Sequence, residues 1–159
     1  MSYARLRSKA QCFVLDRRAT GAVEFAFLAP ALILMALLTV DLGLGGYGQM
    51  QVQTAAQSGA DFALYNYTYT SYSTQNIINA VNSTTANTGI TASPAPTQFY
   101  GCANSDGLEV VSSGSTCTNG QAPGVYVSVY STLTYTPLAA YFGVAQSYVL
   151  NGQATVRVQ

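Results

Sequence analysis

The stretch RRATGAVEFAFLAPALILMALLTVDLGL, residues 17–44, decides the fold of this chain of 159 residues. It contains an apolar run that carries no charge between Glu24 and Asp41. A helix needs about 20 mostly apolar residues to cross the roughly 30 Å hydrocarbon core of a bilayer. Residues 21–46 supply that length, so the sequence predicts one transmembrane helix there and a chain held in a lipid bilayer.

Basic residues are concentrated before the predicted span. Arg157 alone lies beyond it. The five that precede it are Arg5, Arg7, Lys9, Arg17 and Arg18. Because cationic flanks remain on the cytoplasmic side of a span, we expect a basic cytoplasmic leader over residues 1–20 and an extracytoplasmic domain over residues 47–159. A basic tail can also indicate nucleic-acid binding, but next to a span it indicates topology, and no nucleic-acid partner is expected.

A cleaved secretory signal is the competing interpretation of this segment, with Gly43-Leu44-Gly45 as its small-residue cleavage site. Three features argue against it. The apolar run is long, Glu24 lies inside its start, and small or apolar residues continue at helical spacing as far as Leu64. We therefore expect the helix to continue beyond the span, to about residue 65.

Polar residues and glycines within this helix need an explanation. A carboxylate at membrane depth is costly, and two interpretations of Glu24 stay open: it is solvated at the headgroup level, or it pairs with a positive charge on a neighbouring chain. Asp41, at the other end, is expected at the outer interface. The four glycines at positions 43, 45, 46 and 48 indicate either a hinge or a close-packing face for another helix.

The run from Arg17 to Pro30, RRATGAVEFAFLAP, resembles the signature of TadE-like proteins. These are minor pilin-like components of the tight-adherence (Tad/Flp) pilus machinery of bacteria. The similarity extends through Asp41-Leu-Gly43 and the small-residue helix that follows, and returns in residues 125–159. It implies a structural or assembly subunit that acts in pilus biogenesis and surface adherence. Such a subunit crosses the inner membrane once, with its C-terminus extracytoplasmic, and its partners are other pilin-like subunits and the assembly machinery.

The resemblance also gives Glu24 a role. In type IV-like prepilins a glutamate stands at the fifth position after a peptidase cleavage site. Counting back from Glu24 places that site between Ala19 and Thr20, where alanine replaces the usual glycine. A prepilin peptidase is then a further implied partner, and Glu24 pairs with the new α-amino group of Thr20 on a neighbouring subunit. Because a desolvated pair demands good geometry, it would help to fix the register of the subunits.

The residues beyond the span are numerous enough for one small domain. Alternating patterns over about 125–135 and 148–158 predict two C-terminal strands, joined by a short apolar turn or helix within 137–146. Shorter strands are expected at 98–102 and 108–111 around a turn at 104–107, and Ser73 is a predicted N-cap of a short helix. The fold class is α+β: a long N-terminal transmembrane helix extends into a small domain with a short antiparallel sheet, type IV pilin-like in outline.

Twelve tyrosines and no tryptophan are present, and the tyrosines between residues 65 and 72 recur with period two. That spacing indicates extended backbone or an aromatic surface. Two interpretations stay open: the tyrosines pack a small core with wet edges, or they make contacts between subunits.

Cys102 and Cys117 both lie in the predicted outside part, where an oxidising compartment favours a disulfide between them. A loop of this size stabilises the fold by about 3 kcal/mol in the chain-entropy model. Cys12, in the leader, is expected to stay reduced. Asp106 and Glu109 do not have the spacing of an EF-hand loop and instead indicate a turn.

The absence of histidine excludes Ser-His-Asp and Cys-His catalysis. We therefore expect no enzyme, no metal site and no cofactor. Besides a pilus subunit, one function remains open: a single-pass, membrane-anchored periplasmic or surface binding domain that never enters a pilus.

Overall fold

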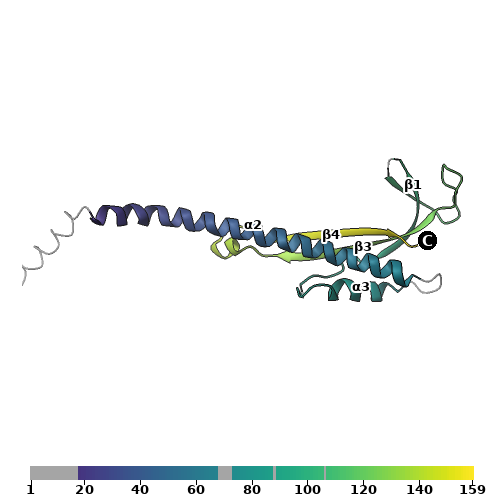
Figure 1. Cartoon of the computed structure of the whole chain (residues 1–159), viewed down its shortest axis with the longest axis horizontal. Helices are drawn as coiled ribbons and strands as arrows, with labels where there is room; N and C mark the ends of the chain where they lie inside the picture. The colour runs from purple at the N-terminus through teal and green to yellow at the C-terminus, as the bar shows by residue number, and fades with distance from the viewer. Residues whose placement is uncertain (1–17, 68–72, 88, 106) are drawn as a thin grey trace, which may run out of the picture. The chain divides into compact units, whose positions relative to one another are not determined.

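The computed structural model describes residues 18–67, 73–87, 89–105 and 107–159. Its elements, in chain order, are α2 (Arg18–Asn66), α3 (Thr74–Ser83), β1 (Thr97–Asn104), β2 (Gly107–Val111), β3 (Gly124–Tyr135), the short 3₁₀ helix η1 (Leu138–Phe142) and β4 (Tyr148–Arg157) (Figure 1). The chain divides into two compact units between Leu42 and Gly43. A long apolar helix followed by a small antiparallel sheet confirms the predicted α+β class.

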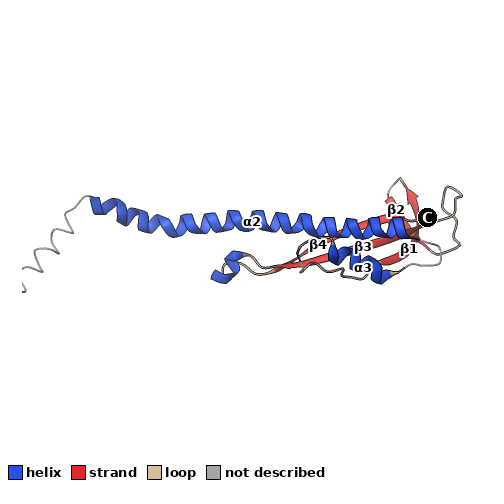
Figure 2. Ribbon diagram, turned by 60° about the horizontal axis from the view of Figure 1, so that its bottom comes forward, coloured by secondary structure: helices blue, strands red, loops and turns tan. Residues whose placement is uncertain are grey.

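The sheet lies wholly in the second unit. Its strands follow the order β2-β1-β3-β4, and every neighbouring pair is antiparallel. The β3–β4 hairpin is the longest pairing, from Tyr126 opposite Arg157 to Tyr135 opposite Tyr148. Alternation along β3 buries one face of the strand, as a half-buried strand requires, and Val127 and Val129 are fully buried there. Figure 2 shows the strands in red beside the blue helices.

The C-terminal part of α2 covers the sheet with a stripe of small residues. The buried members of the stripe recur at helical spacing: Gly45, Gly48, Val52, Ala55, Ala56, Gly59, Ala60 and Ala63. Side chains from α3 complete the same core, where Ile77 and Val81 are buried. Because small side chains let helix and strand backbones come close, this stripe decides how tightly the second unit is packed.

The backbone of α2 comes close to the backbone of the β3–β4 hairpin. Gly152 pairs with Ser131 across the hairpin, and a Cβ atom added to Gly152 would lie 2.7 Å from the carbonyl oxygen of Val52. The same oxygen accepts a buried hydrogen bond of 2.6 Å from Ser131 Oγ. A buried polar group needs such a partner. The Ser131 hydroxyl therefore links the sheet to α2 beside Gly152, where the absence of a side chain allows the two backbones to come close.

Two glutamines of α2 occupy the free edge of β4. Gln49 Nε2 donates to the carbonyl of Asn151 at 2.8 Å, and Gln53 Nε2 donates to the carbonyl of Gln153 at 2.9 Å. Four helical residues rise about 6 Å, close to the roughly 6.7 Å between strand residues two apart. The spacing therefore matches, and the helix satisfies carbonyls that an edge strand would otherwise leave open to another chain.

Several local predictions can be compared with these elements. The expected short helix is α3, and Ser73 Oγ accepts from the Asn76 backbone N–H at its N-terminus. Of the two interpretations of the tyrosine run, extended backbone is wrong for Tyr65, because α2 continues to Asn66; the side chain of Tyr65 is exposed, as an aromatic surface requires. The residues that follow in that run, 68–72, lie outside the described residues, as do Cys12 and most of the basic leader.

The glycines after the span indicate either a hinge or a close-packing face for another helix, and two of them have neighbours in the chain's own sheet. A Cβ atom at Gly48 would lie 3.0 Å from Leu150 Cδ1, and one at Gly45 would lie 2.7 Å from Tyr148 Oη. Gly43 and Gly46 have nothing within 4 Å of such an atom. Two of the four glycines therefore pack against the chain's own strands, and the described structure contains no second helix against them.

Candidate functional site

The first unit presents an apolar surface that no described residue of the unit covers. We define the apolar segment as residues 21–42 of α2. Large side chains are exposed around the helix, among them Phe27 at 81%, Met35 at 69% and Leu42 at 79%. Within the described residues, α2 is one helix long and apolar enough to cross a membrane, and its most apolar window of 18 residues has a mean hydropathy of 2.3. Water does not solvate such a surface favourably, so the segment is a candidate membrane span, as the sequence predicted.

Pro30 lies inside this segment without ending the helix. Proline removes one backbone hydrogen bond and strains a turn, and membrane helices tolerate this where neighbouring groups satisfy the freed carbonyl. Thr39 Oγ1 donates to the Met35 carbonyl at 2.9 Å, so its hydroxyl is satisfied within the helix. Glu24 and Asp41 are the two charged residues of the segment.

Glu24 is exposed on the first turns of the apolar segment. Its carboxylate forms no hydrogen bond or ion pair within the part of the chain that the structure describes. Asp41 follows Glu24 by seventeen positions. This separation corresponds to about 25 Å along a helix, which is close to the thickness of the hydrocarbon core. Asp41 is 8% exposed, and its location at the outer interface stays a prediction.

The predicted cleavage site lies in the first turn of α2, which begins at Arg18. Ala19 and Thr20 are both helical there. Thr20 precedes Glu24 by four residues, so the two positions share one face of the helix. A charge at the new N-terminus of one chain would thus lie about 6 Å along the helix axis from Glu24 of a neighbour packed in parallel register.

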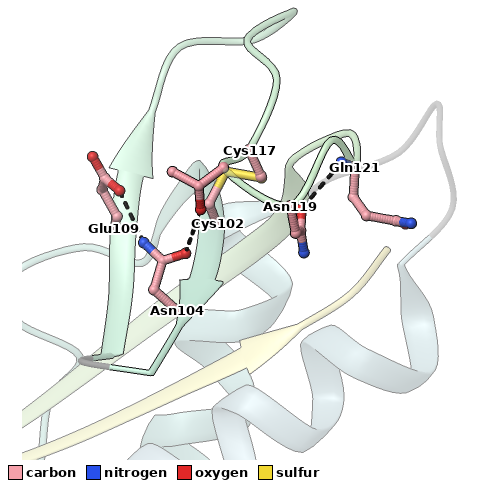
Figure 3. The surroundings of a disulfide bond; sticks show 7 residues. Cys102, Asn104, Glu109, Cys117, Asn119 and Gln121 are labelled. Atoms are coloured by element: carbon pink, nitrogen blue, oxygen red, sulfur yellow. Dashed lines mark hydrogen bonds between the residues drawn. A yellow bond between two sulfur atoms is a disulfide. The ribbon is translucent and has the colours of Figure 1, made fainter.

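The disulfide predicted between Cys102 and Cys117 is present, with the two Cα atoms 5.6 Å apart. It joins β1 to the loop that follows β2 (Figure 3). Cys102 is 3% exposed. Nearby, Gln121 N–H donates to Asn119 Oδ1 at 3.0 Å, and the Gln121 carbonyl accepts from Cys117 N–H at 2.9 Å. The bridge and these turn hydrogen bonds hold a loop that has little core of its own.

Glu109 lies at the same end of the sheet as the disulfide. Its carboxylate accepts from Asn104 Nδ2 at 3.0 Å, and Thr118 Oγ1 donates to Asn104 Oδ1 at 3.4 Å. These contacts tie the β1–β2 hairpin to the disulfide loop. The other predicted turn acid, Asp106, lies outside the described residues. Among the residues the structure describes, no group of three or more His, Cys, Asp or Glu side chains is placed to hold a metal ion.

A surface groove of about 830 Å³ lies beside the disulfide loop. Tyr67, Tyr100, Gln121 and Arg157 are among the residues that line it. Its volume is in the range of small-molecule sites, and its lining combines aromatic rings with polar groups. The sequence offered no signal for this groove, because its residues come from four separate segments.

The helix that contains Glu24, α2, also contains the residues that match a known protein family. Residues 19–61 match the family described as TadE-like protein. We call these residues the TadE-like segment. No curated protein and no solved structure matches the chain.

The TadE-like segment lies entirely within α2. It contains the whole apolar segment, together with most of the small-residue stripe, from Gly45 to Ala60. The match confirms the suspected resemblance over these residues. The similarity also described for residues 125–159 lies outside the matched range and stays a resemblance.

Proposed function

We propose that this protein is a structural or assembly subunit, similar to minor pilins, of a bacterial Tad/Flp-type pilus. The observation that carries the proposal is the extent of the TadE-like segment. It covers both the exposed apolar part of α2 and the part whose small residues hold the sheet. A helix with these two roles anchors a subunit in the membrane and presents a folded domain beyond it.

The proposed orientation places the N-terminus in the cytoplasm and the sheet outside. Two features of the chain support it. Five of the six basic residues precede the apolar segment, as the positive-inside rule requires of a cytoplasmic flank. The second unit contains a disulfide, and disulfides persist in oxidising compartments and are rare in the cytosol. The single crossing would be in the inner membrane.

Glu24 is proposed to act in assembly and not in insertion. Its carboxylate is exposed on an apolar helix, where an unpaired charge is unfavourable at membrane depth. A neighbouring subunit can supply the positive charge: the α-amino group of Thr20 after cleavage between Ala19 and Thr20 by a prepilin peptidase. Pairing would then favour one register between parallel helices.

The experiment compares Glu24→Gln with the control Asp61→Asn, which removes a carboxylate from an exposed position of the same helix. Both variants should reach the membrane. Only Glu24→Gln should reduce the amount of this protein in sheared pili, or the number of pili on the cell. Normal piliation by Glu24→Gln would contradict the assembly role. N-terminal sequencing of the mature protein should begin at Thr20.

Topology has a separate test. A reporter enzyme that is active only in the periplasm should be active after Gln159 and silent after Arg18. The reverse pattern would overturn the orientation, and with it the pilus proposal.

The groove lined by Tyr67, Tyr100 and Arg157 favours a second candidate function, a membrane-anchored binding domain that stays out of the pilus. An intact N-terminus at Met1, together with absence of the protein from sheared pili, would support this function over the first.

A further inference from the structure

The connection between β3 and β4 carries an exposed apolar surface. We define the η1 loop as residues 136–147, which contain η1 (Leu138–Phe142). Tyr141 is 81% exposed, Phe142 67% and Val144 58%. Aromatic and aliphatic side chains of this size on one short loop are unusual on a surface that faces only water.

The η1 loop lies at the end of the sheet where α2 enters the second unit. The positions Val52, Gly48 and Gly45 run toward the N-terminus of α2. Their neighbours on β3 and β4 lie progressively closer to the loop in sequence. Val52 accepts from Ser131, Gly48 adjoins Leu133 and Leu150, and Gly45 adjoins Tyr135 and Tyr148. The last two residues pair across the hairpin and immediately flank the loop. Figure 1 shows the loop as a yellow-green turn beyond the strand ends.

The chemistry of the loop suits an apolar environment. No charged residue occurs between Glu109 and Arg157, so the whole loop is uncharged. Its backbone is partly satisfied internally: Ala140 N–H donates to the Pro137 carbonyl at 3.0 Å, Gly143 N–H to Ala140 at 3.0 Å and Val144 N–H to Ala139 at 3.1 Å. Backbone groups without partners are the main penalty for non-helical chain near hydrocarbon, and these hydrogen bonds lower it.

We propose that the η1 loop is a second membrane contact, which inserts Tyr141, Phe142 and Val144 into the interface of the outer leaflet. The proposal rests on the membrane anchoring proposed above. Aromatic side chains are enriched at this depth because their rings combine apolar surface with polar edges. Two contacts with the bilayer, one through α2 and one through the loop, restrain the tilt of the second unit at the membrane surface.

The chain itself argues for lipid as the partner of this loop. Gly45, which adjoins the strand ends, follows the last residue of the apolar segment, Leu42, by only three positions. Three helical residues rise about 5 Å, so the covalent chain keeps Gly45, which adjoins the strand ends, within that distance of the last residue of the apolar segment. A bilayer that accommodates the apolar segment therefore lies within reach of the loop.

The chain contains no tryptophan, so a single introduced tryptophan reports on one site. The test reconstitutes three full-length variants in phosphatidylcholine vesicles with brominated acyl chains. Phe142→Trp probes the loop, and Leu34→Trp probes the middle of the apolar segment. Val110→Trp on β2 is the matched control, because Val110 is an apolar residue exposed to 68%, like Phe142 at 67%. Near-ultraviolet circular dichroism confirms that each variant is folded, and Tyr141→Trp replaces Phe142→Trp if that variant is not.

We expect blue-shifted, bromine-quenched emission from Phe142→Trp and Leu34→Trp, and unquenched, water-like emission from Val110→Trp. Quenching of Leu34→Trp without quenching of the loop tryptophan would overturn the loop proposal while leaving the anchor intact. Absence of quenching at Leu34→Trp would overturn the anchor itself. A blue shift of the loop tryptophan that grows with protein density, without bromine quenching, would assign the loop to a second copy of the chain and overturn the lipid contact.

Discussion

Replacing Gly152 by alanine tests how tightly α2 is packed on the sheet. The added Cβ would lie 2.7 Å from the Val52 carbonyl oxygen, 2.8 Å from the Val52 carbonyl carbon and 3.0 Å from Gln53 Cα. All three are backbone atoms, which cannot rotate away as a side chain can. Ordinary contacts begin near 3.4 Å, so the helix must retreat by about 0.7 Å.

The loss of stability has two sources, the overpacking of the core and the displacement of α2 from Ser131. Overpacking of a well-packed core costs about 1–3 kcal/mol. The retreat also stretches the buried hydrogen bond from Ser131 Oγ to the Val52 carbonyl, 2.6 Å long in the structure and worth about 1 kcal/mol. We expect Gly152→Ala to lower the free energy of unfolding by about 2–4 kcal/mol, and the melting temperature of the second unit by roughly 10 °C.

The assay is thermal unfolding of the full chain in detergent micelles, followed by the near-ultraviolet circular dichroism of its tyrosines. Gly46→Ala is the matched control, because nothing lies within 4 Å of a Cβ atom at that position and alanine favours a helix over glycine by about 1 kcal/mol. The control should melt at or above the temperature of the parent protein. A Gly152→Ala variant that melts with the parent would refute the close approach of helix and hairpin.

Three further predictions concern contacts that hold the second unit together. Reduction of the Cys102–Cys117 disulfide, which spans 15 positions, should lower the free energy of unfolding by about 3 kcal/mol; equal denaturant midpoints with and without reductant would contradict this. Ser131→Ala should cost about 1 kcal/mol in the same titration, because a buried hydrogen bond is lost. Ser73→Ala removes the N-cap of α3 and should cost about 1 kcal/mol, with faster amide exchange in α3 than in the parent and unchanged exchange in β3.

Much of the secondary structure could be predicted because local patterns control it. The alternation in residues 125–135 and 148–158 corresponds to β3 and β4, which span Gly124–Tyr135 and Tyr148–Arg157. The expected turn at 104–107 joins β1 to β2. In a strand, residues two apart lie on the same face, so the pattern predicts the strand and which of its faces is buried without knowledge of its partner.

The partners of individual side chains could not be predicted in the same way. Gln49 and Gln53 looked like ordinary polar residues on a helix, yet they cover the edge of a strand about 100 positions away in sequence. The groove beside the disulfide loop and the exposed η1 loop were equally hidden, because their significance depends on which segments lie beside them. The periodicity of a local sequence does not encode which distant segments lie beside it.

The sequence by itself determined that this chain has one apolar, charge-flanked helix, a small domain beyond it and two cysteines suited to pairing, because charge, hydropathy and period are properties of neighbouring residues. The tertiary structure alone decided what the small-residue stripe of α2 is for. A helix lined with glycine and alanine can approach another helix or a sheet equally well. The long-range pairing of β3 with β4 places Gly152 and Ser131 opposite Val52. This pairing makes the sheet the packing partner of the small-residue stripe.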